Sequence, residues 1–408
     1  MNKKIISIFI LALLFGTLFF PCSKAPIISE NKKILRSINA LNGNSLFDRY
    51  IEILMKLAHK PSISASIIKN DKVVFAKGYG LYDIEKNKIA QSDTIYLSAS
   101  ISKTVTATAL MQLIENESYS IDLDDDVNNY LPFSLRNPNH PNKPITIRML
   151  LSHRSSLAGD NTFWVCLSYV PGDPDIPDYP HPWLENYLKP NGSAYTPNIW
   201  SESLPGENYA YTNVGFSIVG YLVELISGER FDLYCKNHIF EPLQMHNTSF
   251  RLRDVNISNL ARPYEYKKGS YTPHPHYNML VTYPAGSLRT NVEDLSHFLI
   301  AHMNRGVWNG IRILNNETVE LMHKDHYDSS NERYGFGWII GKSMFGKKEI
   351  GHSGGWPGVH TLMKFRPDEK VGVILFTNSM SPTFDISRIE GLAFQIMFKS
   401  FFIRVKNY

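Results

Sequence analysis

Apolar and polar residues alternate along two stretches near the ends of the chain, and this pattern predicts antiparallel strands. Residues 62–87 (SISASIIKNDKVVFAKGYGLYDIEKN) alternate on both sides of Asn70-Asp71, a dipeptide typical of a tight hairpin turn. Residues 358–379 (GVHTLMKFRPDEKVGVILFTNS) read as two more strands, joined at Pro367–Lys370. We therefore expect one hairpin from each end of the chain.

Helical spacing of apolar residues predicts three helices elsewhere. The first is an amphipathic helix over Leu46–Leu57. The second begins at Ser100 and ends near Glu115–Ser118, and the third closes the chain over residues 388–402. Residues 160–200 are rich in proline and aromatic residues and show no clean period. Strands at both ends and a helical middle predict an α+β fold: one antiparallel sheet built from N- and C-terminal segments, flanked by helices, with an inserted helical lobe.

Composition narrows the class of protein. The 408 residues are 43% hydrophobic and 20% charged, which is typical of a globular protein with a sizeable core. The formal charge is only +4, and the chain carries no basic run interleaved with aromatic residues, so we expect no nucleic-acid partner. It also has no HExxH motif and no Cys/His metal spacing, so we expect neither a metal nor another cofactor.

The first residues have the layout of an export signal. Lys3 and Lys4 precede an uninterrupted apolar stretch, Ile5–Phe20, that is short for a membrane span. We expect a signal peptide over residues 1–25, an N-terminal extension over 26–44 and one domain over 45–400. Retention of the segment as a membrane anchor, or lipid attachment at Cys22, are the alternatives.

Cysteine is scarce, with three in the whole chain. Outside the signal and its boundary only Cys166 and Cys235 remain, which is no disulfide framework. A single bridge between them and two buried thiols are equally compatible with the sequence.

A serine hydroxyl becomes a nucleophile when a base removes its proton, and Ser-x-x-Lys on a helix places both groups on one face. The spacing occurs at Ser29 and Lys32, at Ser66 and Lys69, and at Ser100 and Lys103. Residues three apart in a strand face opposite ways, which excludes the second pair. The first pair precedes any confident element. Only Ser100 opens a helix, whose first-turn amides and dipole favour negative charge at its oxygen.

Two further motifs supply the remaining chemistry. Tyr211-Thr212-Asn213 is the only Tyr-x-Asn in the chain. A phenol near an ammonium group can release its proton and relay protons, and an amide can orient the lysine or hold a substrate carbonyl. The second motif is Gly351–Gly355 (GHSGG), just before a predicted strand, where glycines permit close approach of a substrate backbone.

The three motifs, in this order, resemble those of the serine β-lactamase and penicillin-binding family: Ser-x-x-Lys, Tyr-x-Asn and Lys/His-x-Gly. The resemblance covers roughly residues 45–395. It implies a hydrolase that forms an acyl-enzyme on an ester, a D-amino-acid peptide or a β-lactam. It also assigns roles: Ser100 is the nucleophile, Lys103 its proton acceptor and Tyr211 a general base and acid.

The resemblance further implies that Asn213 positions these groups, and that the backbone amides of Ser100 and Gly355 form an oxyanion hole beside Gly354. His352 stands where many relatives have lysine, and a largely neutral histidine suits a substrate carboxylate less well than a lysine does. Ser156 stands where relatives usually show glycine. We interpret His153 as a hydrogen-bonded packing residue beneath the site.

Two other functions use the same residues. GHSGG also fits the Gly-x-Ser-x-Gly nucleophile elbow of α/β-hydrolases, with Ser353 as nucleophile, but that fold needs a helix after the elbow and then an acid before a histidine. Here a strand pattern follows, and His360 precedes Asp368 and Asp385. The second alternative is a non-catalytic protein of the same fold that binds a cell-wall peptide.

Overall fold

The computed structural model describes residues 46–158, 181–277, 279, 281–327, 333–343 and 346–380. The chain divides into two compact units, Met1–Ile53 and Leu54–Tyr408. Helix α3 (Leu46–Leu57) begins in the first unit and ends in the second, with the bounds that the sequence predicts. The expected signal peptide, the N-terminal extension and the closing helix over 388–402 lie outside the described residues.

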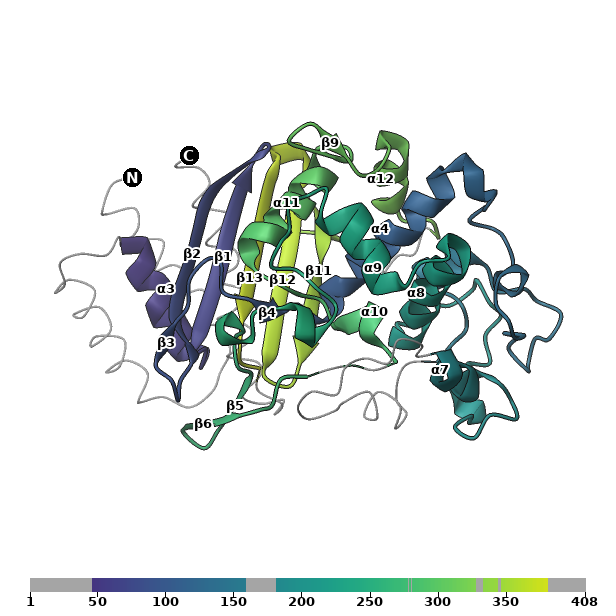
Figure 1. Ribbon diagram of the computed structural model, residues 1–408, viewed down its shortest axis with the longest axis horizontal. Coiled ribbons are helices and arrows are strands. Elements are labelled where there is room, and N and C mark those ends of the chain that lie inside the picture. The colour runs from purple at the N-terminus through teal and green to yellow at the C-terminus, as the bar shows by residue number, and fades with distance from the viewer. Residues whose placement is uncertain are drawn as a thin grey trace. The chain divides into compact units, whose positions relative to one another are not determined.

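The second unit is built on an antiparallel sheet of seven described strands, in the order β10-β11-β12-β13-β1-β2-β3 (Figure 1). Strand β1 pairs with β13 in register from Ile63 opposite Thr377 to Lys69 opposite Val371, so strands from both ends of the chain lie side by side. The strands are β1 (Ser62–Lys69), β2 (Lys72–Asp83), β3 (Lys88–Ile89), β10 (Ile339–Lys342), β11 (Lys348–Trp356), β12 (Val359–Arg366) and β13 (Val371–Thr377).

Both predicted hairpins are present. Asn70 adopts a left-handed conformation with φ 58° in the turn between β1 and β2, and Lys370 does so with φ 50° between β12 and β13. GHSGG precedes the predicted strand, which is β12, and the sequence missed that the motif itself lies inside strand β11. Short two-stranded ladders also occur, formed by β4 (Tyr96–Leu97) with β7 (Arg289–Thr290), β5 (Tyr264–Lys267) with β6 (Ser270–Pro273), and β8 (Val307–Trp308) with β9 (Ile311–Arg312).

Most of the described helices form a group beside the sheet, and α11 lies against the sheet itself (Figure 1). Helices α4, α5, α8, α9 and α10 pack mainly on one another, whereas α11 packs on β1, β2 and β13. This arrangement confirms the predicted α+β fold with an inserted helical lobe. The helices besides α3 are α4 (Ser102–Glu115), α5 (Ile147–Leu151), α7 (His181–Leu188), α8 (Asn213–Ser227), α9 (Phe231–Cys235), α10 (Tyr283–Gly286), α11 (Val292–Met303) and α12 (Asn316–Met322).

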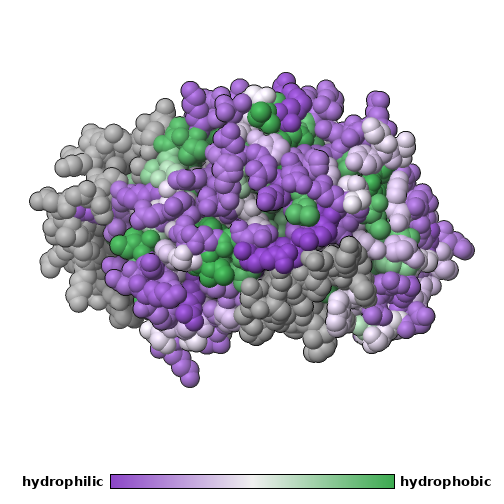
Figure 2. Space-filling view, viewed as in Figure 1, coloured by the Kyte–Doolittle hydropathy of each residue, from purple (hydrophilic) through white to green (hydrophobic). Residues whose placement is uncertain are grey.

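The described surface carries apolar side chains in separate places. The face in Figure 2 is mostly hydrophilic, with several distinct apolar patches. Ile89, Ile257 and Trp183 are among the most exposed large apolar residues, at 62%, 50% and 49%. Scattered apolar residues are normal on a globular protein. Among the described helices, none is long and apolar enough to cross a membrane.

Buried histidines pack between α11, α12 and the segment before β10. His302 on α11 is 2% exposed, its Nε2 lies 3.1 Å from Thr108 Oγ1, and its ring centroid lies 5.4 Å from that of His323 and 4.6 Å from that of Trp338. Burial lowers the pKa of His302 to about 3. The ring is therefore neutral at physiological pH.

This burial predicts destabilisation by acid. In the unfolded chain the pKa of this histidine is about 6.5, so the unfolded chain binds a proton at residue 302 as pH falls below that value. The folded chain binds the proton only near pH 3. The free energy of unfolding therefore decreases between these two pH values. Urea unfolding at pH 7.5 and 5.0 measures the loss. We expect His302→Gln to reduce it by about 2 kcal/mol. Equal losses in wild type and His302→Gln would contradict the expectation.

Candidate active site

Ser100 lies in a tight turn directly before helix α4. The turn is a 3-10 helix, η1 (Ala99–Ile101), so the α-helix begins two residues later than the sequence predicts. Ala99 has φ 49°, a left-handed conformation that is unfavourable for a residue with a Cβ. Ser100 itself is partly exposed. The turn therefore presents a partly exposed Ser100 directly after a residue in an unfavourable backbone conformation.

Hydrogen bonds from neighbouring segments hold this turn in place. Ser102 Oγ donates to the Ala99 carbonyl (2.6 Å) and accepts from the Leu288 amide (3.0 Å). On the other side, Ser98 Oγ donates to the Leu288 carbonyl (2.8 Å), and Thr361 Oγ1 on β12 donates to the Ser98 carbonyl (2.8 Å). These bonds fix the backbone on both sides of Ser100, so the unfavourable φ of Ala99 persists.

Lys103 is completely buried and joins three elements. Its Nζ donates to Ser100 Oγ (3.2 Å), to Asn213 Oδ1 (2.6 Å) and to the Ala285 carbonyl (2.9 Å). These three acceptors match the three protons of an ammonium group. The ring of Tyr211 adds a cation–π contact, with its centroid 4.8 Å from Nζ. The structure therefore brings Ser100, Lys103, Tyr211 and Asn213 together, as the sequence predicts.

The start of helix α8 sets the position of the tyrosine and the asparagine. Thr212 is the N-cap residue, and its Oγ1 accepts from the Gly215 amide at 3.4 Å. Asn213 opens the helix, which aims its amide at Lys103. His153 supports this segment from beneath: its Nδ1 accepts from the Thr212 amide (3.2 Å), and its ring lies 4.4 Å from that of Tyr211.

The role expected for His153 as a packing residue agrees with this geometry. His153 is fully buried, and burial, followed by the charge of Lys103, lowers its pKa well below the usual value. Because Nδ1 accepts a hydrogen bond, the proton of the neutral ring is on Nε2. His153 therefore positions Tyr211 and adds no charge.

His352 lies deeper than a charged substrate-binding residue would. It is 2% exposed, and its ring centroid lies 6.2 Å from that of Tyr211. Nδ1 lies 2.6 Å from the Ser353 carbonyl, and Nε2 lies 2.9 Å from the hydroxyl of Tyr334. Burial, followed by the charge of Lys103, lowers the pKa of His352 to about 3. The side chain at the position where many relatives have lysine is thus uncharged in this protein. Direct contact between His352 and a substrate stays a prediction.

The glycines after His352 let strand β11 approach the Ser100 turn. A Cβ on Gly354 would lie 2.2 Å from the Ser98 carbonyl oxygen and 2.2 Å from Thr361 Oγ1, which no side chain can do. Gly355 is exposed and has more space, since its Cβ would meet the side chain of Met380 at 3.4 Å. Glycine at 354 is therefore a steric requirement for bringing β11 beside Ser100.

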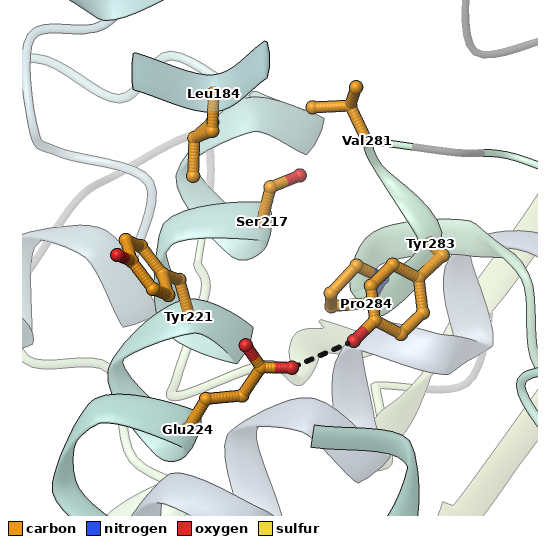
Figure 3. Close-up of a pocket in the computed structure, with 7 residues that line it drawn as sticks. All are labelled: Leu184, Ser217, Tyr221, Glu224, Val281, Tyr283 and Pro284. Atoms are coloured by element: carbon orange, nitrogen blue, oxygen red, sulfur yellow. Dashed lines mark hydrogen bonds between the residues drawn. The ribbon is translucent and has the colours of Figure 1, made fainter. Parts of the chain in front are cut away.

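Contacts between α8 and α10 position the carbonyl that Lys103 uses. A Cβ on Gly220 would lie 2.6 Å from Pro284, so the two helices touch there. Tyr283 donates its hydroxyl proton to Glu224 (3.2 Å) across the small pocket drawn in Figure 3, and Thr106 Oγ1 donates to the Pro284 carbonyl (2.5 Å). The next residue is Ala285, whose carbonyl is thereby aimed at Lys103.

Sequence reasoning missed the Ala285 carbonyl and Tyr334. A backbone carbonyl has no residue signature, and nothing in the sequence around Tyr334 indicated a partner 18 positions later. Ser156, where relatives usually have glycine, adopts a backbone conformation that favours glycine. Its φ of 62° is in the left-handed region that favours glycine, and its hydroxyl accepts from Asn137 Nδ2 (3.1 Å).

The remaining serine motifs are placed apart from this chemistry. Ser66 Oγ is paired with Ser296 Oγ (2.8 Å), and Lys69 donates to the Glu369 carbonyl, so this pair does not cooperate. Ser353 lies within a strand that continues into a turn and β12, which contradicts the nucleophile-elbow alternative because that fold needs a helix there. Ser29 and Lys32 lie outside the described residues.

Two expectations concern cysteine and metals. Cys235 is a buried free thiol, and burial raises its pKa well above the usual value; Cys166 lies outside the described residues. In the described part of the chain, no group of three or more His, Cys, Asp or Glu side chains could hold a metal ion.

Comparison with known proteins gives one family. The family model described as Beta-lactamase matches residues 47–395. The chain is 25% identical to Protein flp of Staphylococcus aureus (strain N315) over 342 residues. The aligned region covers 81% of this chain but only 62% of that protein. The chain thus spans less than two thirds of that relative.

Solved structures show the same fold. The octameric penicillin-binding protein homologue from Pyrococcus abyssi is similar over 86% of this chain and 76% of its own, with 28% identity and a TM-score of 0.65. The D-amino acid amidase from Ochrobactrum anthropi SV3, complexed with L-phenylalanine, is similar over 89% and 99%, with 20% identity and a TM-score of 0.70.

The approach of β11 to the Ser100 turn can be tested with one methyl group. Gly354→Ala forces β11 away from the Ser98 carbonyl, which displaces the backbone amide of Gly355 from Ser100. We expect covalent labelling of Ser100 by a serine-directed phosphonate to slow by roughly tenfold or more. Gly341→Ala on β10 is the control, because the nearest atom to its Cβ would be 4.0 Å away. Equal labelling rates in both variants would show that the close approach is unimportant.

Proposed function

The chain belongs to the beta-lactamase family, and on that premise we propose that it is a serine hydrolase in which Ser100 forms an acyl-enzyme with an ester or amide substrate. One observation carries this proposal: the completely buried Lys103 donates a hydrogen bond to the partly exposed hydroxyl of Ser100. A buried cation beside a nucleophile stabilises negative charge at the oxygen and offers a route for its proton.

The proposed reaction has two halves. Ser100 Oγ bonds to the substrate carbonyl carbon while its proton passes to Lys103, or through Lys103 to Tyr211. All three protons of the lysine are in hydrogen bonds, so it must release one before it can accept another. Tyr211, whose ring faces Nζ, is proposed to react as the phenolate, which the neighbouring ammonium stabilises. The phenolate takes that proton from Lys103 and returns it to the leaving oxygen or nitrogen.

The tetrahedral intermediate carries its negative charge on the former carbonyl oxygen. We assign the amides of Ser100 and Gly355 as its donors, since Gly354 permits β11 to lie beside the Ser100 turn. The bond to the leaving group then breaks. Water attacks the acyl-enzyme by the same proton route in reverse and releases the acid together with free Ser100.

The neutral state of His352 favours uncharged acyl donors. A lysine at this position would attract a substrate carboxylate, whereas His352 is buried with both ring nitrogens hydrogen-bonded. We therefore propose an ester or a D-amino-acid amide or peptide as substrate, with β-lactams turned over weakly. The fold shared with the D-amino acid amidase is compatible with this substrate class.

We also propose that the protein is exported through residues 1–25, on the strength of Lys3, Lys4 and the apolar stretch that follows. Expressed in a bacterium with its full N-terminus, the protein recovered from outside the cytoplasm should begin between about residue 22 and residue 30 when sequenced. Recovery of the whole protein in the cytosol, beginning at Met1, would contradict the export proposal and leave the hydrolase proposal untouched.

One variant tests the nucleophile and two test its proton route. Ser100→Ala removes the attacking atom, so turnover of an activated neutral ester and covalent labelling by a phosphonate should both vanish. Lys103→Ala and Tyr211→Phe keep the nucleophile and remove its proton route, which should lower kcat/KM by roughly 10³-fold or more. Intact-protein mass spectrometry and steady-state kinetics measure both effects.

Ser353→Ala is the matched control, because it removes a hydroxyl from the neighbouring strand and should retain labelling at Ser100 and most of the turnover. A wild-type protein that is neither labelled nor active would favour the peptide-binding alternative. Full activity in Ser100→Ala would refute the proposal.

A further inference from the structure

Tyr334 is a buried residue outside the three motifs, yet it contacts the site from a fourth segment. It is 3% exposed and lies just before β10, where it forms a bridge with Ile339. Two backbone bonds anchor the turn that follows: the Gly335 amide donates to the Trp338 carbonyl (2.8 Å), and the Gly337 amide donates to the Leu151 carbonyl (3.2 Å). Tyr334 is therefore held by a fixed turn and not by a loose loop.

The hydrogen bonds of His352 determine which ring nitrogen carries the proton. The Ser353 carbonyl can only accept, so Nδ1 must be the protonated nitrogen. Nε2 then presents a lone pair, and the Tyr334 hydroxyl must be the donor to it. Burial raises the pKa of Tyr334 well above its usual value, so this hydroxyl keeps its proton at all physiological pH values. The direction of both hydrogen bonds is thus fixed.

The acceptor of this chain is part of the strand that faces Ser100. Residues two apart in a strand direct their backbone groups to the same edge, so the Ser353 carbonyl shares an edge with the Gly355 amide. Among the described residues, β10 pairs with β11 only as far as Gly351, whereas β12 pairs with it through Trp356. After Gly351, one edge of β11 therefore makes no backbone pairing with β10. Hydrogen bonds from side chains can orient the backbone of β11 there.

We propose that Tyr334 is a positioning residue of the active site, which holds His352 in its Nδ1–H tautomer and through it orients the β11 backbone that ends in the Gly355 amide. This inference rests on the proposed function, because it assigns that amide to the oxyanion hole. Tyr334 does not contact the reacting atoms itself. It acts through His352, and its removal should lower the rate of reaction more than it weakens the binding of substrate.

The surroundings of His352 keep its ring neutral. The titratable groups that face it are the Lys103 ammonium from α4, the Tyr211 phenol before α8, and Tyr334. His153 lies behind Tyr211 and Tyr334 and is itself neutral. Loss of the Tyr334 hydroxyl leaves Nε2 of the buried ring without its hydrogen-bond donor, so the ring is no longer held in one orientation.

Tyr334→Phe tests the proposal, because it removes one oxygen and keeps the ring. With a neutral activated ester, we expect kcat to fall about tenfold at pH 7, the equivalent of losing one buried hydrogen bond, with KM changed less than twofold. Tyr82→Phe on β2 is the matched control, because its hydroxyl donates to the Ser258 carbonyl (2.8 Å) and to no residue of the site.

A second measurement uses the wild-type protein and does not depend on the variant folding. In ¹⁵N-histidine-labelled protein, the imidazole signals of His352, assigned by their absence from His352→Gln, should show a protonated Nδ1 and an unprotonated Nε2 from pH 5 to pH 8. A ring protonated on Nε2, or one that titrates near pH 6, overturns the proposal.

Kinetics for Tyr334→Phe within twofold of wild type over the whole pH range also overturn it, as does an equal loss in Tyr82→Phe. If the wild type hydrolyses no ester and its Ser100 is not labelled, the proposed function fails. The imidazole spectra of the wild type and of Tyr334→Phe then decide whether Tyr334 fixes His352.

Discussion

The buried ammonium group of Lys103 is the interaction on which the rest of the site depends. Removing a cation from water costs several kcal/mol unless its protons are hydrogen-bonded. Its three acceptors come from the turn before α4, the first residue of α8 and the last turn of α10. Because each acceptor is delivered by a different element, the cation is stable only when all three are docked. The same docking brings Ser100, Asn213 and the ring of Tyr211 within reach of one another.

A single buried cation constrains the charge of every neighbouring group. His153 and His352 both lie close enough for Lys103 to lower their pKa values further than burial alone does. Both rings are neutral, and the hydrogen bond that each makes fixes its tautomer: Nδ1 accepts in His153, whereas Nδ1 donates in His352. The site therefore concentrates its positive charge on one nitrogen, next to the oxygen where negative charge would develop.

The sheet and the helical group contribute different parts of the site, and both tolerate unfavourable local features to do so. Ala99 holds a left-handed backbone conformation, and Gly354 leaves no space for a side chain. Each is maintained by contacts made elsewhere, such as the hydrogen bond from Thr361 on β12 to the Ser98 carbonyl. Strain at the junction of two structural layers is the physical consequence of bringing a strand edge against a helix start.

The sequence by itself determined the elements whose signals are local. Alternation around Asn70 predicted the first hairpin, the spacing and the helical setting singled out Ser100 with Lys103, and strand geometry excluded Ser66. Only the tertiary structure decided which groups complete the site. The Ala285 carbonyl belongs to the backbone and has no side-chain signature, and the partnership of Tyr334 with His352 depends on how two strands pair. The neutral state of His352 was likewise a matter of burial, and burial is a property of the packed chain: residue type gives an ordinary pKa, and only the surroundings shift it.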